Sequence, residues 1–106
     1  MFQKLSEANR ARQFEWDEGQ KFTPMFFSNA LAGEVGEVCN IVKKHERTRL
    51  GLKGKTATIE QLADEIADVI IYAEILAATC NIDLGEAVKS KFNKTSEELG
   101  FKTRLE

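Results

Sequence analysis

The sequence is poor in the residues that build tight turns, covalent frameworks and zinc sites. It holds one Pro, two Cys and one His among 106 residues. A single Pro with scattered Gly argues against a turn-rich all-β fold, and two distant cysteines make neither a disulfide framework nor a zinc pattern. Because Cys39 and Cys80 both lie in apolar-rich segments, we expect two reduced, buried thiols.

A strong net charge and a long apolar run are also missing. The formal net charge is −2, so no overall basic field favours binding to nucleic acid or to an anionic membrane. No apolar run approaches the ~20 residues that span a bilayer, and the first residues lack the apolar core of a signal peptide. We therefore expect a cytoplasmic protein with no nucleic-acid partner and no membrane partner.

What the chain has in quantity favours helices. Glu, Lys, Ala and Leu are abundant, and all are good helix formers. Four helices are predicted, at roughly residues 4–18, 24–45, 58–80 and 84–99. The end signals are Gly19, the Thr23-Pro24 pair, Thr58 with Gln61, Asp83 with Glu86, and Gly100. The length and the 42% hydrophobic content suit one domain, residues 1–106, with an all-α, four-helix bundle-like protomer.

Acidic side chains stand inside the apolar stripes of the second and third predicted helices. At about 100° per residue, Glu34 and Glu65 fall at the centres of these stripes, and Glu37 and Asp68 lie about 60° away, at the edges. Glu34 and Glu65 are 31 residues apart, as are Glu37 and Asp68. The two helices thus share one plan, with a carboxylate on the core-facing surface and another one turn later.

This plan breaks the usual pattern, in which acids occupy the wet face of a helix. A buried, unpaired carboxylate costs several kcal/mol or takes up a proton, and neither helix offers Arg or Lys on these faces. Mg²⁺ prefers oxygen ligands and suits carboxylates at i and i+3 on two facing helices. The spacing therefore indicates a Mg²⁺ site formed by Glu34, Glu37, Glu65 and Asp68. The alternative is a functionless, partly exposed acidic groove in which the four acids are solvated or paired with lysines.

The same residues resemble a known family. Glu34-Val35-Gly36-Glu37 followed by Glu65-Ile66-Ala67-Asp68 is similar to the E-x-x-E…E-x-x-D signature of the MazG-type all-α nucleoside triphosphate pyrophosphohydrolases. Tyr72 after Asp68 resembles the arrangement in dCTP pyrophosphatases, where the tyrosine helps to hold the nucleotide. Lys89, Asn93 and Lys94 resemble the family's K-x-x-x-N-[KR] element, whose residues contact phosphates. Trp16 lies roughly where that subgroup places a base-stacking tryptophan. Thr95-Ser96 departs from the aromatic-Pro pair that often follows this element.

The resemblance implies a Mg²⁺-dependent hydrolase that converts a nucleoside triphosphate, in particular a deoxynucleoside triphosphate, to the monophosphate and pyrophosphate, with a role in cleaning the nucleotide pool. It also implies a homodimer or a dimer of dimers that assembles through the helical core. Either Glu34 or Glu37 is expected to orient or deprotonate the attacking water, and the residues themselves do not decide between them.

Other functions remain open at this stage. The chain could be a non-enzymatic helical interaction module, or a related all-α hydrolase that acts on dUTP or phosphoribosyl-ATP. A third alternative, a nucleic-acid binder that uses the basic segment 43–55, is disfavoured by the acidic balance and by the lack of aromatic side chains in that segment.

Overall fold

The computed structural model describes residues 1–106, which form four helices and no strand. The helices are α1 (Phe2–Trp16), α2 (Pro24–Arg49), α3 (Ile59–Thr79) and α4 (Leu84–Leu99). The all-α prediction is confirmed, and each predicted helix is present.

The helix ends follow local hydrogen bonds. The Thr58 side chain accepts from the Gln61 N–H (3.1 Å) and the Gln61 side chain accepts from the Thr58 N–H (2.7 Å), so the expected capping box is formed. α1 ends before the predicted stop at Gly19, because Asp17 turns the chain and its carboxylate accepts the N–H of Phe22 at 2.8 Å. α2 runs to Arg49, beyond the predicted end at residue 45.

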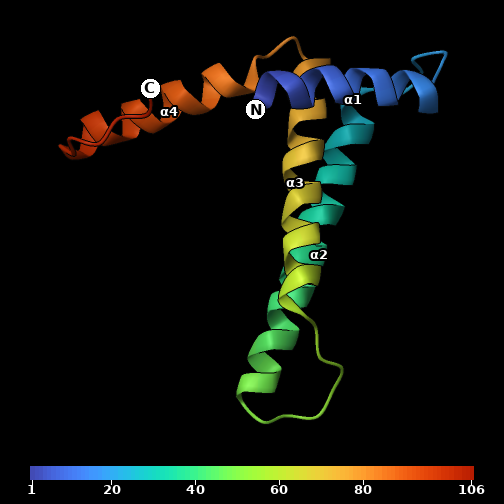
Figure 1. The fold of residues 1–106 in the computed structure, drawn as a ribbon, viewed down its shortest axis with the longest axis vertical. Helices are drawn as coiled ribbons and strands as arrows, with labels where there is room; N and C mark the ends of the chain where they lie inside the picture. Colours follow the sequence, from blue (N-terminus) through green and yellow to red (C-terminus); the bar gives the residue numbers. More distant parts are fainter.

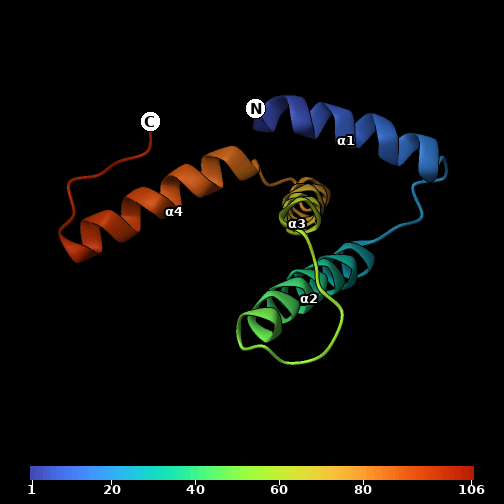
Figure 2. The same cartoon turned by 60° about the horizontal axis from the view of Figure 1, so that its bottom comes forward.

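α2 and α3 form an antiparallel pair, which is the stem in Figure 1; in Figure 2, α3 is seen nearly end-on and α2 runs obliquely beside it. The loop that joins them is tied to α2 by two side chains. His45 Nε2 lies 2.9 Å from the Ala57 carbonyl oxygen, and Arg47 donates to the Lys55 carbonyl oxygen at 3.0 Å. Because the pair is antiparallel and closed at one end, the middle of α2 faces the first half of α3.

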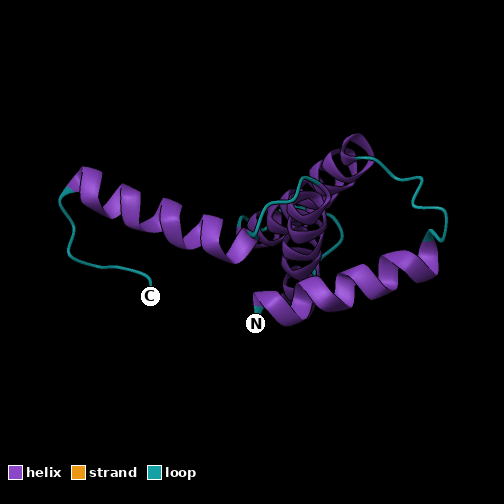
Figure 3. Ribbon diagram, turned by 90° about the horizontal axis from the view of Figure 1, so that it is seen from above, coloured by secondary structure: helices purple, strands orange, loops and turns teal.

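The other two helices leave this stem. α1 crosses its upper end, and α4 runs away from it in the opposite direction, as Figures 1 and 3 show. Only four apolar residues are buried: Phe27, Ile41, Ile75 and Ala77. The radius of gyration is 17.1 Å, against about 13 Å for a compact domain of this length. The four helices of one chain therefore do not close into the expected bundle, because α4 makes only a few contacts with α1 and α3 and leaves Val88 and Phe92 exposed.

The expectation of buried thiols is wrong for the single chain. Cys39 and Cys80 are both free and exposed. Cys39 lies about 140° around α2 from Glu34, on the side away from α3, and Cys80 is the residue that ends α3. None of the four helices combines the length and the apolar character that a membrane span requires.

Candidate active site

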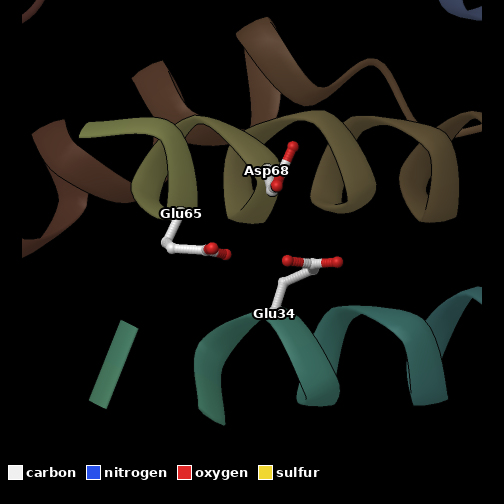
Figure 4. Close-up of side chains that lie close together, drawn as sticks. All are labelled: Glu34, Glu65 and Asp68. Carbon is white, nitrogen blue, oxygen red and sulfur yellow. The ribbon is translucent and has the colours of Figure 1, made fainter. Parts of the chain in front are cut away.

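Three carboxylates from two helices meet in the middle of the stem. Glu34 projects from α2 toward Glu65 and Asp68 on α3, as Figure 4 shows. One oxygen from each carboxylate lies within 4.8 Å of those from the other two, and all three side chains are half-buried. The antiparallel pairing of α2 and α3 produces this meeting, since it places the centre of one apolar stripe against the centre of the other.

The group is electrostatically uncompensated. Burial raises the pKa of Glu34, and the charges of Asp68, Glu65 and Glu37 raise it further. The only ion pair in the chain joins Arg49 to Glu46, so no Lys, Arg or His neutralises the three carboxylates. An all-oxygen donor set of this kind, with no cationic side chain among it, fits Mg²⁺ by its chemistry.

Glu37, the fourth predicted ligand, stands apart from this group. It lies one turn after Glu34 on α2, but its side chain is exposed and it is not among the three carboxylates that come together. Its charge still contributes to the raised pKa of Glu34. The structure thus places Glu37 at the rim of the site and the other three acids at its centre.

The two predicted base-contacting residues lie in different surroundings. Tyr72 is half-buried on α3, one turn after Asp68. Trp16 ends α1, is 60% exposed, and meets the ring of Phe22 edge-on at 6.1 Å between centroids. Phe22 in turn stacks on Phe26 at 4.1 Å. Trp16 therefore belongs to an aromatic cluster at the junction of α1 and α2.

The predicted phosphate-contacting residues are on α4, far from the acids of the same chain. Lys89 lies ~8 Å along α4 from its first residue, and Asp68 lies ~17 Å down α3 from its last residue. The two helices diverge from their junction in Figure 1. Lys89, Asn93 and Lys94 are thus not brought to the carboxylates within one chain. The Asn93 amide instead bonds to the backbone of Leu105.

One buried polar pair was not foreseen from the sequence. Asn9 of α1 donates to the Glu74 carboxylate at 2.8 Å, and both residues are 3% exposed. They line a cavity of about 380 Å³ between α1 and α3, which includes none of the three grouped carboxylates. The sequence does carry a signal for this pair, because Glu74 is an acid inside an otherwise apolar run from residue 69 to 78.

A comparison with known protein families identifies the domain. Residues 22–98 match the MazG nucleotide pyrophosphohydrolase domain. This range contains the grouped carboxylates, Tyr72 and the α4 residues, and it excludes Trp16.

Two curated relatives are similar over most of the chain. The chain is 33% identical over 87 residues to dCTP pyrophosphatase 1 of Mus musculus. The identity to dCTP pyrophosphatase 1 of Homo sapiens is also 33% over 87 residues. Each alignment covers 81% of this chain and 50% of the relative, so the chain spans about half the length of these proteins. The family match covers well over half of the chain and includes every acid of the candidate site, so the chain belongs to the family of MazG nucleotide pyrophosphohydrolase domains.

Proposed function

We propose that the chain is a Mg²⁺-dependent hydrolase that cleaves a deoxynucleoside triphosphate to the monophosphate and pyrophosphate. The observation that carries this proposal is the group of Glu34, Glu65 and Asp68, three carboxylates within 4.8 Å without a neutralising side chain. The membership of the chain in a family of nucleotide pyrophosphohydrolase domains supports this class of reaction. The names of the two relatives make dCTP the first substrate to test. A role in clearing unwanted nucleotides from the pool would follow from this reaction.

The residues of the chain divide the work of the reaction. Phosphoryl transfer depends mainly on positioning and on charge stabilisation at the phosphate oxygens. Glu34, Glu65 and Asp68 would hold Mg²⁺, with Glu37 joining from the rim. When bound, the ion would neutralise phosphate charge and promote the ionisation of water. From the rim, Glu37 would also orient the attacking water and accept its proton, whereas Glu34 would serve only as a ligand of the ion.

We also propose that the complete site needs a second copy of the chain. Within one chain, α4, which carries Lys89 and Lys94, runs away from the stem that carries the acids, and large apolar side chains such as Val88 and Phe92 remain exposed. A homodimer, or a dimer of dimers, would cover these side chains and bring Lys89 and Lys94 of one copy to the acids of another. Tyr72 would lie against the nucleotide, and Trp16 would close the base end of the pocket.

The decisive experiment measures pyrophosphate and monophosphate released from a panel of nucleotides, with Mg²⁺ and with a chelator in its place. The panel contains the canonical deoxynucleotides and ribonucleotides, dUTP, damaged deoxynucleotides and phosphoribosyl-ATP. We expect equal amounts of both products from a deoxynucleotide, only with Mg²⁺, and loss of release in Glu65→Gln. Glu60→Gln is the matched control, because Glu60 is an exposed acid on the same helix. Absence of release from every nucleotide would leave the interaction-module alternative.

Mixing two inactive variants tests the contribution of the second copy. Glu65→Gln removes one of the three grouped carboxylates, and Lys89→Gln removes one of the predicted phosphate-contacting residues of α4. If each site takes its acids from one chain and its lysine from another, random mixed dimers recover about a quarter of the wild-type rate. A mixture as inactive as its components would place both groups in the same chain.

A further inference from the structure

The segment after α4 has a defined path, although it contains no regular secondary structure. Gly100 ends α4 with a φ of 73°, in the left-handed region. The Gly100 N–H donates to the Glu97 carbonyl oxygen (3.2 Å) and the Phe101 N–H donates to the Ser96 carbonyl oxygen (2.8 Å). These bonds give hydrogen-bond partners to the carbonyl groups of the last turn of α4, and the left-handed residue reverses the chain direction. Residues 101–106, here called the tail, then run back beside α4, as Figure 2 shows.

Asn93 fixes the far end of the tail to α4. Its side-chain amide donates to the Leu105 carbonyl oxygen at 2.9 Å, and its side-chain oxygen accepts the Leu105 N–H at 2.7 Å. Both polar atoms of the Asn93 side chain thus bond to the backbone of one residue, Leu105, as two residues do when they pair in an antiparallel sheet. Within the tail, Arg104 Nη1 donates to the carbonyl oxygens of Phe101 (2.6 Å) and Thr103 (3.0 Å), which orients its guanidinium group.

The tail lies on the face of α4 that carries a predicted phosphate ligand. Lys89, Asn93 and Ser96 follow the i, i+4, i+7 spacing that puts residues on one helix face. Ser96 is 6% exposed, although α4 packs on no helix along most of its length. The tail therefore does not reverse into solvent but covers part of this face.

The charge of the tail argues against its being a plug. A segment that imitates phosphate to block the site would be acidic, whereas the tail carries Lys102 and Arg104 against a single Glu106. Neither Lys89 nor the two tail cations has a carboxylate within ion-pair distance, since the only ion pair is Arg49–Glu46. The tail thus adds two cations without a carboxylate partner to a segment held beside α4, and such cations attract an anion.

We propose that the tail is part of the phosphate-binding surface, with Lys102 and Arg104 as phosphate-binding residues and Asn93 as the positioning residue that clamps the tail beside Lys89. This rests on the proposed function, because the anion is the phosphate chain of its nucleotide. Nε and Nη2 of Arg104 form no hydrogen bond within the chain, and a guanidinium group with free N–H donors binds phosphate oxygens in pairs. Both polar atoms of Asn93 are already engaged by Leu105, and only one amide N–H of its side chain is left over.

The first test removes the tail charges in the complete chain. The probe is inorganic pyrophosphate with Mg²⁺, and its dissociation constant is measured by calorimetry. Lys102→Gln with Arg104→Gln should weaken binding about tenfold, which corresponds to ~1.4 kcal/mol, and should raise KM for the nucleotide with kcat within about twofold. Arg12→Gln together with Lys21→Gln, which removes two exposed charges from other parts of the chain, should leave binding within about twofold. Unchanged or tighter binding in the tail variant would overturn the proposal.

The second test separates positioning from direct contact. Leu105→Pro deletes the N–H that Asn93 accepts and leaves every tail charge in place. Both Leu105→Pro and Asn93→Ala should raise KM, and neither should add its full effect to Arg104→Gln, because all three disturb one surface. In Asn93→Ala, hydrogen exchange at the Leu105 amide should become faster.

The outcomes distinguish this proposal from the proposed function. Faster exchange at Leu105 with unchanged pyrophosphate binding would reduce the clamp to a structural role and refute the proposal. Failure of the wild-type chain to hydrolyse any nucleotide, with pyrophosphate binding still dependent on the tail, would refute the enzymatic function and retain the tail as an anion-binding element.

Discussion

Glu34→Gln should be more stable than the wild type without metal, and less stable than the wild type with bound Mg²⁺. In the wild type, the carboxylate of Glu34 has an oxygen within 4.8 Å of those of Glu65 and Asp68. At this distance two like charges repel by about 0.9 kcal/mol in water and about 3.5 kcal/mol at an effective dielectric constant of 20. Because the side chains are only half-buried, the repulsion lies near the value in water. Removing the charge of Glu34 ends its repulsion with both Glu65 and Asp68, and should stabilise the metal-free protein by about 2 kcal/mol.

Binding of Mg²⁺ should reverse the order of stability of the wild type and Glu34→Gln. A ligand at a hundred times its dissociation constant stabilises the native state by about 2.7 kcal/mol. The wild type gains this and Glu34→Gln gains little, because one of three central ligands has lost its charge. Thermal unfolding with a chelator and with saturating Mg²⁺ therefore gives opposite rankings, with shifts of at least about 4 °C per kcal/mol. Glu60→Gln should change neither ranking.

The pH dependence supplies the sign of the same effect. The pKa of Glu34 is raised above its ordinary value in the folded protein by burial and by the neighbouring carboxylates, so ionisation of Glu34 destabilises the folded state. That destabilisation is fully present above the folded-state pKa and disappears as the pH falls toward the unfolded-state value. The stability gain of Glu34→Gln without metal should shrink over the same range. A variant less stable than wild type in chelator at neutral pH would refute the reasoning, since the three carboxylates would then not repel.

Three further predictions follow from particular contacts. Asp68→Asn should lower pyrophosphate release at least a hundredfold with unchanged helix content by far-ultraviolet circular dichroism, and wild-type turnover would remove Asp68 from the site. Asn9→Ala should lower the free energy of unfolding in urea by about 1–3 kcal/mol, because it leaves the buried Glu74 carboxylate without its donor; adding Glu74→Leu should restore much of the loss, and an undiminished loss would contradict this cause. The pKa of Asp17 is lowered by its backbone hydrogen bonds to Lys21 and Phe22, so its stabilising contribution is present above about pH 4 and fades as the pH falls; urea midpoints of Asp17→Asn and wild type should differ at pH 6 and converge in acid, and a constant difference would exclude the carboxylate as its source.

Local signals in the sequence were sufficient to predict the helices and the acid group. The capping pair Thr58 and Gln61 and the stop at Gly100 are each formed by residues within a few positions of one another, so they need no knowledge of the tertiary structure. The angular position of Glu34 and Glu65 inside their apolar stripes is likewise a property of each helix alone. The three acids come together because the two stripes face each other in the antiparallel pair.

The arrangement of α1 and α4 could not be predicted in this way. α1 meets α3 through a polar pair, Asn9 and Glu74, and hydrophobic periodicity carries no information about such a contact. α4 has an apolar face with Phe92 on it, which a sequence-based argument assigns to the core of the same chain, yet the structure leaves it exposed. A helix face records that it needs a partner, and not whether that partner lies in the same chain. The tail was missed for a related reason, because the bonds of Asn93 to Leu105 join residues with no periodic relation.

The distribution of charge in the chain bears on function. The acids of the stem lack a cation, and the cations of α4 and the tail lack an acid, although both kinds of charge occur in one short chain with a net charge of only −2. If stability alone governed the arrangement, the two groups would gain by approaching each other, since isolated like charges cost free energy in each. A nucleotide complexed with Mg²⁺ carries both missing counter-charges, its cation for the carboxylates and its phosphates for the lysines. The separation of charge within the chain is therefore what the proposed site requires, because in that proposal the nucleotide lies between the acids of one copy and the cations of another.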